Sequence, residues 1–472
     1  MSRATAVSCC LATFLIASAA SAQSPTLAPR PAEAAPAPFR FPAVTTRTLP
    51  NGLRLVVSEN HAVPVVAVRL ETGADSTLDP VGQHGLADVV AQALGQASTH
   101  FSPEALSDTL AALGVVFRDT LFTTRTANFR SVLGIMADLV MHPVFADASV
   151  QSAKAAVTQA RRAIDNSTIP RAREVMYDAL FGAAQHLNNR PSAASIASIT
   201  TADVAGFHSA WYRPSRMTLI LVGDITPAEA EREATLAFGA WRPAGAAGTT
   251  AAVADTERGT QHPTTIYLVD RPGAKQSTIV FGGVGPALTA SDYAPVAALD
   301  ATFGATASSR LTQALRQQHA WAYTAASHMD LHRANEPMVL WAATDVAPAA
   351  TDSSIVAALA TLRASGSAIV YDEATLRSAN AIVVGSVQRL IATDDALAAR
   401  LKGLVEAGLP MDYYVTVAGQ MDRLTPARIV EAAERYDNPD RLVIVVVGDR
   451  ATIEAPVRAL GFPVTLVPRT GP

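Results

Sequence analysis

The 472-residue chain has little cysteine, little charge imbalance and few charged residues, and each shortage excludes a class of protein. Its only cysteines are Cys9 and Cys10, so the rest of the chain has no disulfide, thiol nucleophile or thiolate metal site. The 37 Lys+Arg against 41 Asp+Glu give a net charge of −4, which argues against nucleic acid as the main partner. With 17% charged and 49% hydrophobic residues, the chain is not disordered and can form large cores.

Residues 1–22 have the pattern of a secretory signal peptide. Arg3 precedes an apolar run at 11–16, and the small residues at 20–22 form a cleavage site. After them no stretch reaches the roughly 18 uninterrupted apolar residues of a membrane helix. The best candidate, 442–447, has the length of a strand. The sequence therefore predicts a soluble protein that is exported to the periplasm and has no membrane span.

Two low-complexity segments divide the chain. Residues 23–40 are rich in proline and alanine without apolar periodicity, which predicts a flexible leader. Residues 243–260 form a second low-complexity stretch and are interpreted as a linker. The linker separates an N-terminal domain at 41–242 from a C-terminal domain at 261–469, as expected at roughly 100–200 residues per domain.

The two halves resemble each other, which indicates an internal duplication. Landmark residues recur at one constant offset, in the pairs Thr200 and Thr425, Pro214 and Pro439, and Gly223 and Gly448. Each half begins with strand-like alternation, continues through helices with one apolar stripe, and ends in an apolar strand that runs into Gly-Asp. This order predicts an α+β fold of two homologous repeats, each a mainly antiparallel sheet with helices packed on one face.

Short motifs in a fixed order carry a resemblance to a known family. They are LPNGL at 49–53, GLA at 85–87, MHPVF at 141–145, SRL at 309–311 and EAGLP at 406–410. Over about residues 41–469 the chain resembles the insulinase/pitrilysin-type (inverzincin) zinc metallopeptidases. It is similar to two-repeat bacterial subunits that lack the zinc motif, and to the subunits of mitochondrial processing peptidase.

In that family Gly-Leu-Ala leads into a helical His-x-x-Glu-His, in which two imidazoles ligate zinc and the Glu polarises the metal-bound water. The matching positions here are Asp88, Ala91 and Gln92. Ala91 cannot act as a base, and Gln92 is a poor zinc ligand. A third ligand, a Glu, is expected where this chain has Gln159 and Ala160. The resemblance thus implies a degenerate zinc motif and no metal bound by this chain.

Two further sets of His and Asp residues carry metal-ligating side chains. His84 and Asp88 are one helical turn apart, and His328, Asp330 and His332 share one side of a predicted strand. Each set lacks a Glu base and a fourth ligand, so we interpret both as polar surface residues. The sequence also contains neither a nucleophile elbow nor a phosphate-binding loop.

The second half keeps a different motif. Arg310-Leu311 is followed by Arg316 and, seven residues later, by Tyr323. The resemblance implies that Arg316 and Tyr323 contribute to an active cleft, where a guanidinium and a phenol donate hydrogen bonds to the scissile carbonyl of a peptide. The alternative is that Arg316 is a solvated helix residue and that Tyr323 is half-buried at the start of a strand.

The resemblance therefore implies a non-zinc subunit of a periplasmic heterodimeric metallopeptidase. The chain would be inactive alone, a paralogous partner would carry zinc, and unfolded peptides would bind by adding a strand to a sheet edge. Two alternatives stay open. The chain is either a catalytically inactive pseudopeptidase that acts as a structural or peptide-binding scaffold, or an independent peptidase with a rebuilt metal site.

Overall fold

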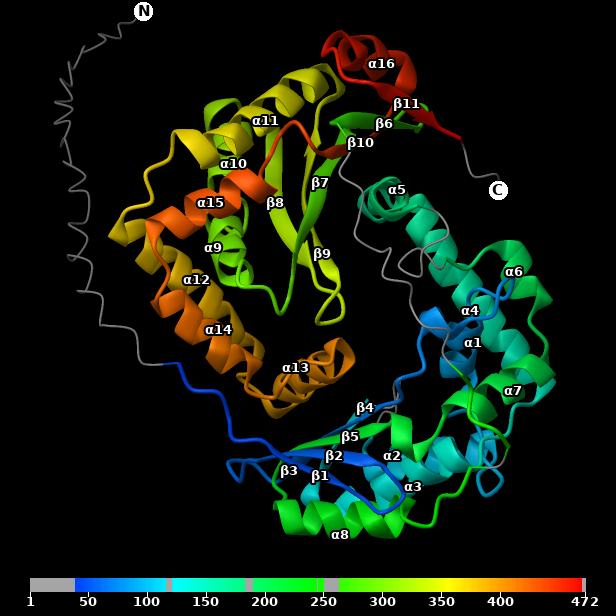
Figure 1. The fold of residues 1–472 in the computed structure, drawn as a ribbon. Helices are drawn as coiled ribbons and strands as arrows, with labels where there is room; N and C mark the ends of the chain where they lie inside the picture. Colours follow the sequence, from blue (N-terminus) through cyan, green and yellow to red (C-terminus); the bar gives the residue numbers. More distant parts are fainter. Residues whose placement is uncertain (1–38, 116–120, 183–189, 244, 250–262, 469–472) are drawn as a thin grey trace, which may run out of the picture. The chain divides into compact units, whose positions relative to one another are not determined.

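The computed structural model describes residues 39–115, 121–182, 190–243, 245–249 and 263–468 (Figure 1). The predicted signal peptide at 1–22, almost all of the leader at 23–40 and most of the linker at 243–260 lie outside the described residues. Within the described ranges no helix combines the length and the apolar character needed to cross a membrane.

The first sheet has five strands in the order β1-β2-β5-β3-β4. Neighbouring strands are antiparallel except β2 and β5, which are parallel. The bounds are β1 Thr45–Thr48, β2 Arg54–Glu59, β3 Val65–Glu71, β4 Leu121–Arg125 and β5 Thr218–Gly223.

Four helices of the first half begin at capping residues. The hydroxyls of Ser102, Ser192, Thr200 and Thr226 each accept a backbone N–H of the following first turn, which stabilises the start of the helix. The helical elements are η1 Ser76–Leu78, α1 Leu86–Ala93, α2 Pro103–Leu113, η2 Thr126–Asn128, α3 Phe129–Met141, α4 Asp147–Asn166, α5 Thr168–Phe181, α6 Ala193–Ser198, α7 Thr201–Trp211, η4 Pro214–Arg216 and α8 Pro227–Phe238.

The second sheet has six strands in the order β11-β6-β10-β7-β9-β8. Its strands are β6 Thr265–Asp270, β7 Ser277–Ala287, β8 Ala322–Asp330, β9 Pro337–Val346, β10 Val443–Gly448 and β11 Val464–Val467. The accompanying helices are α9 Tyr293–Phe303, α10 Arg310–Thr312, η5 Gln313–Gln318, η6 Pro348–Ala350, α11 Thr351–Ser367, α12 Glu373–Leu390, α13 Asp394–Ala407, α14 Tyr413–Asp422, α15 Pro426–Tyr436 and α16 Arg450–Ala459.

The repeated landmarks lie at equivalent places in the two halves. Thr200 and Thr425 are the N-cap residues of α7 and α15. Gly223 and Gly448 end β5 and β10, and each of these strands pairs in parallel with the first long strand of its half and antiparallel with the next. The predicted α+β class with two homologous repeats is confirmed. The domain boundaries at 41–242 and 261–469 stay predictions.

The central strands are buried on both faces, which the sequence analysis did not predict. All six residues of β5 and all six of β10 are buried. One face of the first sheet packs against helices of its own half, and α13 of the second half covers β3 and β5. Conversely, α5 of the first half covers β7 and β10. Each sheet is therefore packed against one helix from the other half.

Candidate functional site

The helix that corresponds to the zinc motif is well formed. Gly85, with φ 99°, precedes α1, and the Asp79 carboxylate accepts hydrogen bonds from the Gly85 N–H at 2.7 Å and the Ala87 N–H at 2.8 Å. Burial raises the pKa of Asp79 to about 6 despite these two hydrogen bonds. Val89 and Val90 anchor α1 in the first core, so the loss of zinc ligands has not disrupted the scaffold.

The side chains at the motif positions do not fit a catalytic zinc ion. Asp88, Ala91 and Gln92 are all exposed on α1. Gln159 and Ala160 are exposed on α4, which packs against α1. Ala91 and Ala160 have no atom that could bind a metal, and the two glutamines are neutral amides. Asp88 is therefore the one suitable ligand at these five positions, whereas a zinc site needs three or more protein ligands.

The three residues weighed as a metal site in the second half each contact a different partner. His328 stacks on Trp341 with ring centroids 4.3 Å apart. Asp330 forms an ion pair with Arg173 and accepts the Tyr177 hydroxyl at 2.9 Å. The Nδ1 of His332 lies 2.8 Å from the Pro337 carbonyl oxygen. Among the described residues these side chains do not form a metal cluster.

His84 also lacks a metal-binding neighbourhood. Its Nδ1 is buried and has no hydrogen-bond partner among the described residues. No group of three ligating side chains that includes His84 or Asp88 occurs in the described part of the chain.

Arg316 and Tyr323, predicted as a pair from their spacing, lie together. The Arg316 guanidinium carbon is 5.0 Å from the centroid of the Tyr323 ring, a cation–π distance. Arg316 is exposed, and Tyr323 is 79% exposed, so the tyrosine is not half-buried. Both polar tips are therefore available to a ligand.

The segment that carries the pair departs from regular geometry at three points. Arg316 lies in η5, a π-helical turn, and Ala320 has φ 55° in the left-handed region. The pairing of β8 with β9 then shifts register between Ala322 and Ala325. π-Turns, positive φ at non-glycine residues and bulges all cost stability or regularity and are concentrated at functional sites. Tyr323 lies within this irregular segment, at the second residue of β8, and is exposed.

Two further side chains extend this surface and were not singled out from the sequence. The rings of His319 and Trp321 stack with centroids 4.1 Å apart at 10°. The backbone N–H of Trp321 donates to the Leu315 carbonyl at 2.9 Å, which holds the connecting turn against η5. The signal in the sequence was the run from Arg316 to Tyr323, in which basic and aromatic residues are concentrated.

β8 is an edge strand of the second sheet within the described residues, because β9 is its one neighbour there. An edge strand presents a row of main-chain donors and acceptors to which an extended peptide can add. Tyr323, Thr324 and His328 are exposed along β8. The Arg316–Tyr323 pair thus lies at the beginning of an edge strand. In the middle of this strand two main-chain groups already have partners, because the Ser327 N–H donates to the Gly304 carbonyl at 3.1 Å and the Ala325 carbonyl accepts the Thr312 hydroxyl at 2.9 Å.

Comparison with known proteins agrees with this architecture. Residues 198–369 match the family described as Peptidase M16 inactive domain. The predicted resemblance to the insulinase/pitrilysin-type peptidases is confirmed. The matched segment begins before α7 and ends after α11, so it contains Arg316 and Tyr323 and excludes α1.

Solved structures show the same fold at low identity. They are a peptidase M16 inactive domain from Pseudomonas fluorescens (TM-score 0.73, 19% identity, 86% of this chain and 98% of that one), a protease from Helicobacter pylori (0.76, 18%, 87% and 100%), and the first half of the periplasmic protease PqqL from Escherichia coli (0.67, 14%, 90% and 98%).

A curated relative is the probable zinc protease PqqL of Escherichia coli (strain K12), which is 23% identical over 203 residues. The alignment covers 39% of this chain and 22% of the relative. The chain therefore matches well under two thirds of that protein's length.

Proposed function

We propose that this chain is the non-zinc subunit of a periplasmic heterodimeric zinc metallopeptidase that degrades peptides, and that Arg316 and Tyr323 complete the active site of a zinc-bearing paralogous subunit. One contrast carries the proposal. The positions for zinc ligands on α1 hold Asp88, Ala91 and Gln92, whereas the Arg–Tyr pair is intact, exposed and in cation–π contact.

The chemistry assigned to the pair is stabilisation of negative charge. The partner's zinc supplies the activated water. The Arg316 guanidinium and the Tyr323 hydroxyl donate hydrogen bonds to the scissile carbonyl oxygen as it becomes an oxyanion. The ring of Tyr323 restricts the arginine before substrate arrives, which lowers the entropy cost of ordering a long side chain.

The edge of β8 supplies a means of holding the peptide. An extended substrate that pairs with main-chain groups of β8 other than the Ser327 N–H and the Ala325 carbonyl, which already have partners, gains hydrogen bonds that do not depend on its sequence. Because β8 begins next to Tyr323, the backbone of such a substrate passes the Arg316–Tyr323 pair. Unfolded peptides are therefore the substrate class that this arrangement favours.

Export to the periplasm is supported by the signal-like sequence at 1–22 and by the periplasmic protease PqqL among the similar structures. The test is to recover the tagged mature chain from its host's periplasm with its paralogue, and to assay cleavage of a quenched peptide. We expect activity in the mixture that a chelator removes, and none in this chain alone. Cleavage by this chain alone, or full activity of the paralogue alone, would contradict the proposal.

A scaffold without a catalytic role is the second candidate, favoured by the match to a domain of the inactive type. It predicts that the two subunits associate and that the paralogue keeps its full activity without this chain. The same reconstitution therefore distinguishes the two functions.

A further inference from the structure

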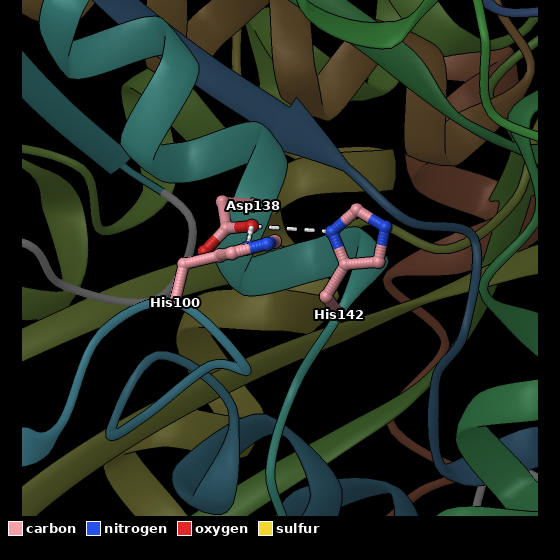
Figure 2. Close-up of side chains that lie close together, drawn as sticks. All are labelled: His100, Asp138 and His142. Atoms are coloured by element: carbon pink, nitrogen blue, oxygen red, sulfur yellow. Dashed lines mark hydrogen bonds and ion pairs between the residues drawn. The ribbon is translucent and has the colours of Figure 1, made fainter.

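Three side chains with metal-ligating atoms converge at the C-terminal end of α3. They are His100, Asp138 and His142, and their ligand atoms all lie within 4.8 Å of one another (Figure 2). Among the described residues this is the one group of three or more such side chains that meets this distance. None of the three belongs to the degenerate zinc motif.

Both imidazoles present the same nitrogen to the same carboxylate oxygen. His100 Nδ1 lies 2.6 Å from Asp138 Oδ1, and His142 Nδ1 lies 3.1 Å from it. The two rings meet edge to face, with centroids 5.6 Å apart at 89°, so their nitrogens converge without the rings stacking. Figure 2 shows both rings directed at the carboxylate.

The backbone around these side chains holds the arrangement in place. Asp138 and His142 are one helical turn apart at the end of α3, which puts them on one face. The loop that carries His100 is tied to the exit of α3, because the Thr99 N–H donates to the His142 carbonyl at 3.0 Å and the Val144 N–H donates to the Ala97 carbonyl at 3.2 Å.

Ser98 contacts the second oxygen of the Asp138 carboxylate and orients it. Its hydroxyl donates to Asp138 Oδ2, and its oxygen accepts the backbone N–H groups of His100 at 3.2 Å and Phe101 at 3.0 Å. Although partial burial works in the opposite direction, hydrogen bonds from Ser98, His100 and His142 lower the pKa of Asp138. The hydrogen bond from Ser98 fixes the Asp138 carboxylate, as a neighbouring hydrogen-bond donor fixes a ligand in known metal sites.

We propose that His100, His142 and Asp138 bind one divalent transition-metal ion of the zinc class through the two Nδ1 atoms and a carboxylate oxygen. Two imidazoles and one carboxylate are a donor set that suits zinc and its neighbours in the first transition row. On binding, the proton of each neutral imidazole moves from Nδ1 to Nε2, which faces away from the ion. The side chains of His100 and His142 are 66% and 48% exposed, so water completes the coordination.

The ion would join the loop at 97–101 to the end of α3. Such a site binds the folded chain and not the unfolded one, so metal raises the melting temperature. This inference does not depend on the proposed peptidase function, because no position assigned to peptide cleavage takes part in it.

The test is titration of the purified, metal-stripped mature chain with Zn²⁺ alone, followed by calorimetry and by thermal melting. We expect one equivalent to bind and to raise the melting temperature. His100→Ala and His142→Ala, both at exposed positions, remove stoichiometric binding and leave the melt in chelator unchanged. Ser98→Ala weakens binding about tenfold through loss of the outer-shell hydrogen bond.

His61→Ala is the matched control. His61 also contacts two carboxylates, but its Nδ1 faces Asp224 at 2.6 Å and its Nε2 faces Glu59 at 2.7 Å, so its partners lie on opposite sides of the ring. This variant should bind Zn²⁺ like the wild type. The proposal is overturned if the wild type binds no stoichiometric Zn²⁺, if the His100→Ala/His142→Ala double variant keeps its affinity, or if Asp88→Ala alone removes binding.

Discussion

The guanidinium of Arg316 lies over the ring of Tyr323, 5.0 Å from its centroid, where a π-turn leads into an edge strand. The two residues are seven positions apart in sequence and come from different elements. Ala320, which lies between them in the sequence, has a left-handed backbone with φ 55°. A flexible arginine is thereby held beside a phenol in solvent, which is an arrangement suited to binding an anion or a polarised carbonyl.

The degenerate motif on α1 gives the first prediction. Because Asp88 and Gln92 are exposed and belong to no group of three ligating side chains among the described residues, Asp88→Ala and Gln92→Ala should leave the peptidase activity of the reconstituted complex within twofold, by the usual tolerance of surface sites. The measurement is the initial rate of cleavage of a quenched peptide at saturating partner. A large loss of rate would instead support the hypothesis that this chain has a rebuilt metal site of its own.

A buried carboxylate in the second half gives a pH prediction. Burial raises the pKa of Asp437 to about 7, against the pull of Arg310 and with a contribution from Asp300, whose own pKa burial raises to about 6. The protonated form of Asp437 is therefore favoured in the folded chain. Its stabilising contribution is fully present below the unfolded pKa of about 4 and is lost as the pH rises through about 7.

Asp437→Asn should remove this dependence. Between pH 5 and pH 8 the wild type should lose about 2–3 kcal/mol more unfolding free energy than the variant. Urea unfolding at the two pH values measures the difference. Asp440→Asn is the control, because the Asp440 side chain is 77% exposed, and it should follow the wild type. Equal slopes for wild type and Asp437→Asn would show that Asp437 ionises normally.

Helices α5 and α13 each pack on the sheet of the other half, which predicts that the two halves unfold together. Leu401 on α13 is fully buried in the core shared with the first sheet, and Met176 on α5 is fully buried in the core shared with the second. Leu401→Ala and Met176→Ala should each cost about 2–5 kcal/mol, typical of a truncated core side chain. Leu236→Ala, at a side chain that is 65% exposed, should cost under about 0.5 kcal/mol.

Calorimetry checks the cooperativity of these variants. A single transition that moves down in temperature is expected for both core variants. Separation into two transitions, with only one of them shifted, would show that the halves fold independently and that α5 and α13 do not couple them.

Local patterns predicted much of the fold. The apolar run at 442–447, which has the length of a strand, is β10 within one residue at each end. This prediction succeeds because an apolar run acts over a few neighbouring residues. The constant offset of Thr200 and Thr425 marked equivalent helix starts for the same reason.

Features that depend on distant parts of the chain were not predictable. Nothing near α5 in the sequence indicates that it covers β7 and β10, which begin only at Ser277 and Val443, because tertiary structure decides which elements pack together. The cluster of His100, Asp138 and His142 has a partial signal, since Asp138 and His142 are spaced by four, but His100 joins them only through the turn at 97–101. The Arg316–Tyr323 pair was predicted from a motif, and its exposure was not.

The measurement that tests the central claim most directly compares Arg316→Ala and Tyr323→Phe in the reconstituted complex. Each removes one donor to the scissile carbonyl, so kcat should fall about 10²-fold while association of the subunits is unchanged. Arg377→Ala, at an exposed arginine on α12, is the matched control and should keep full activity. Full activity of both Arg316→Ala and Tyr323→Phe would contradict a catalytic contribution from this chain.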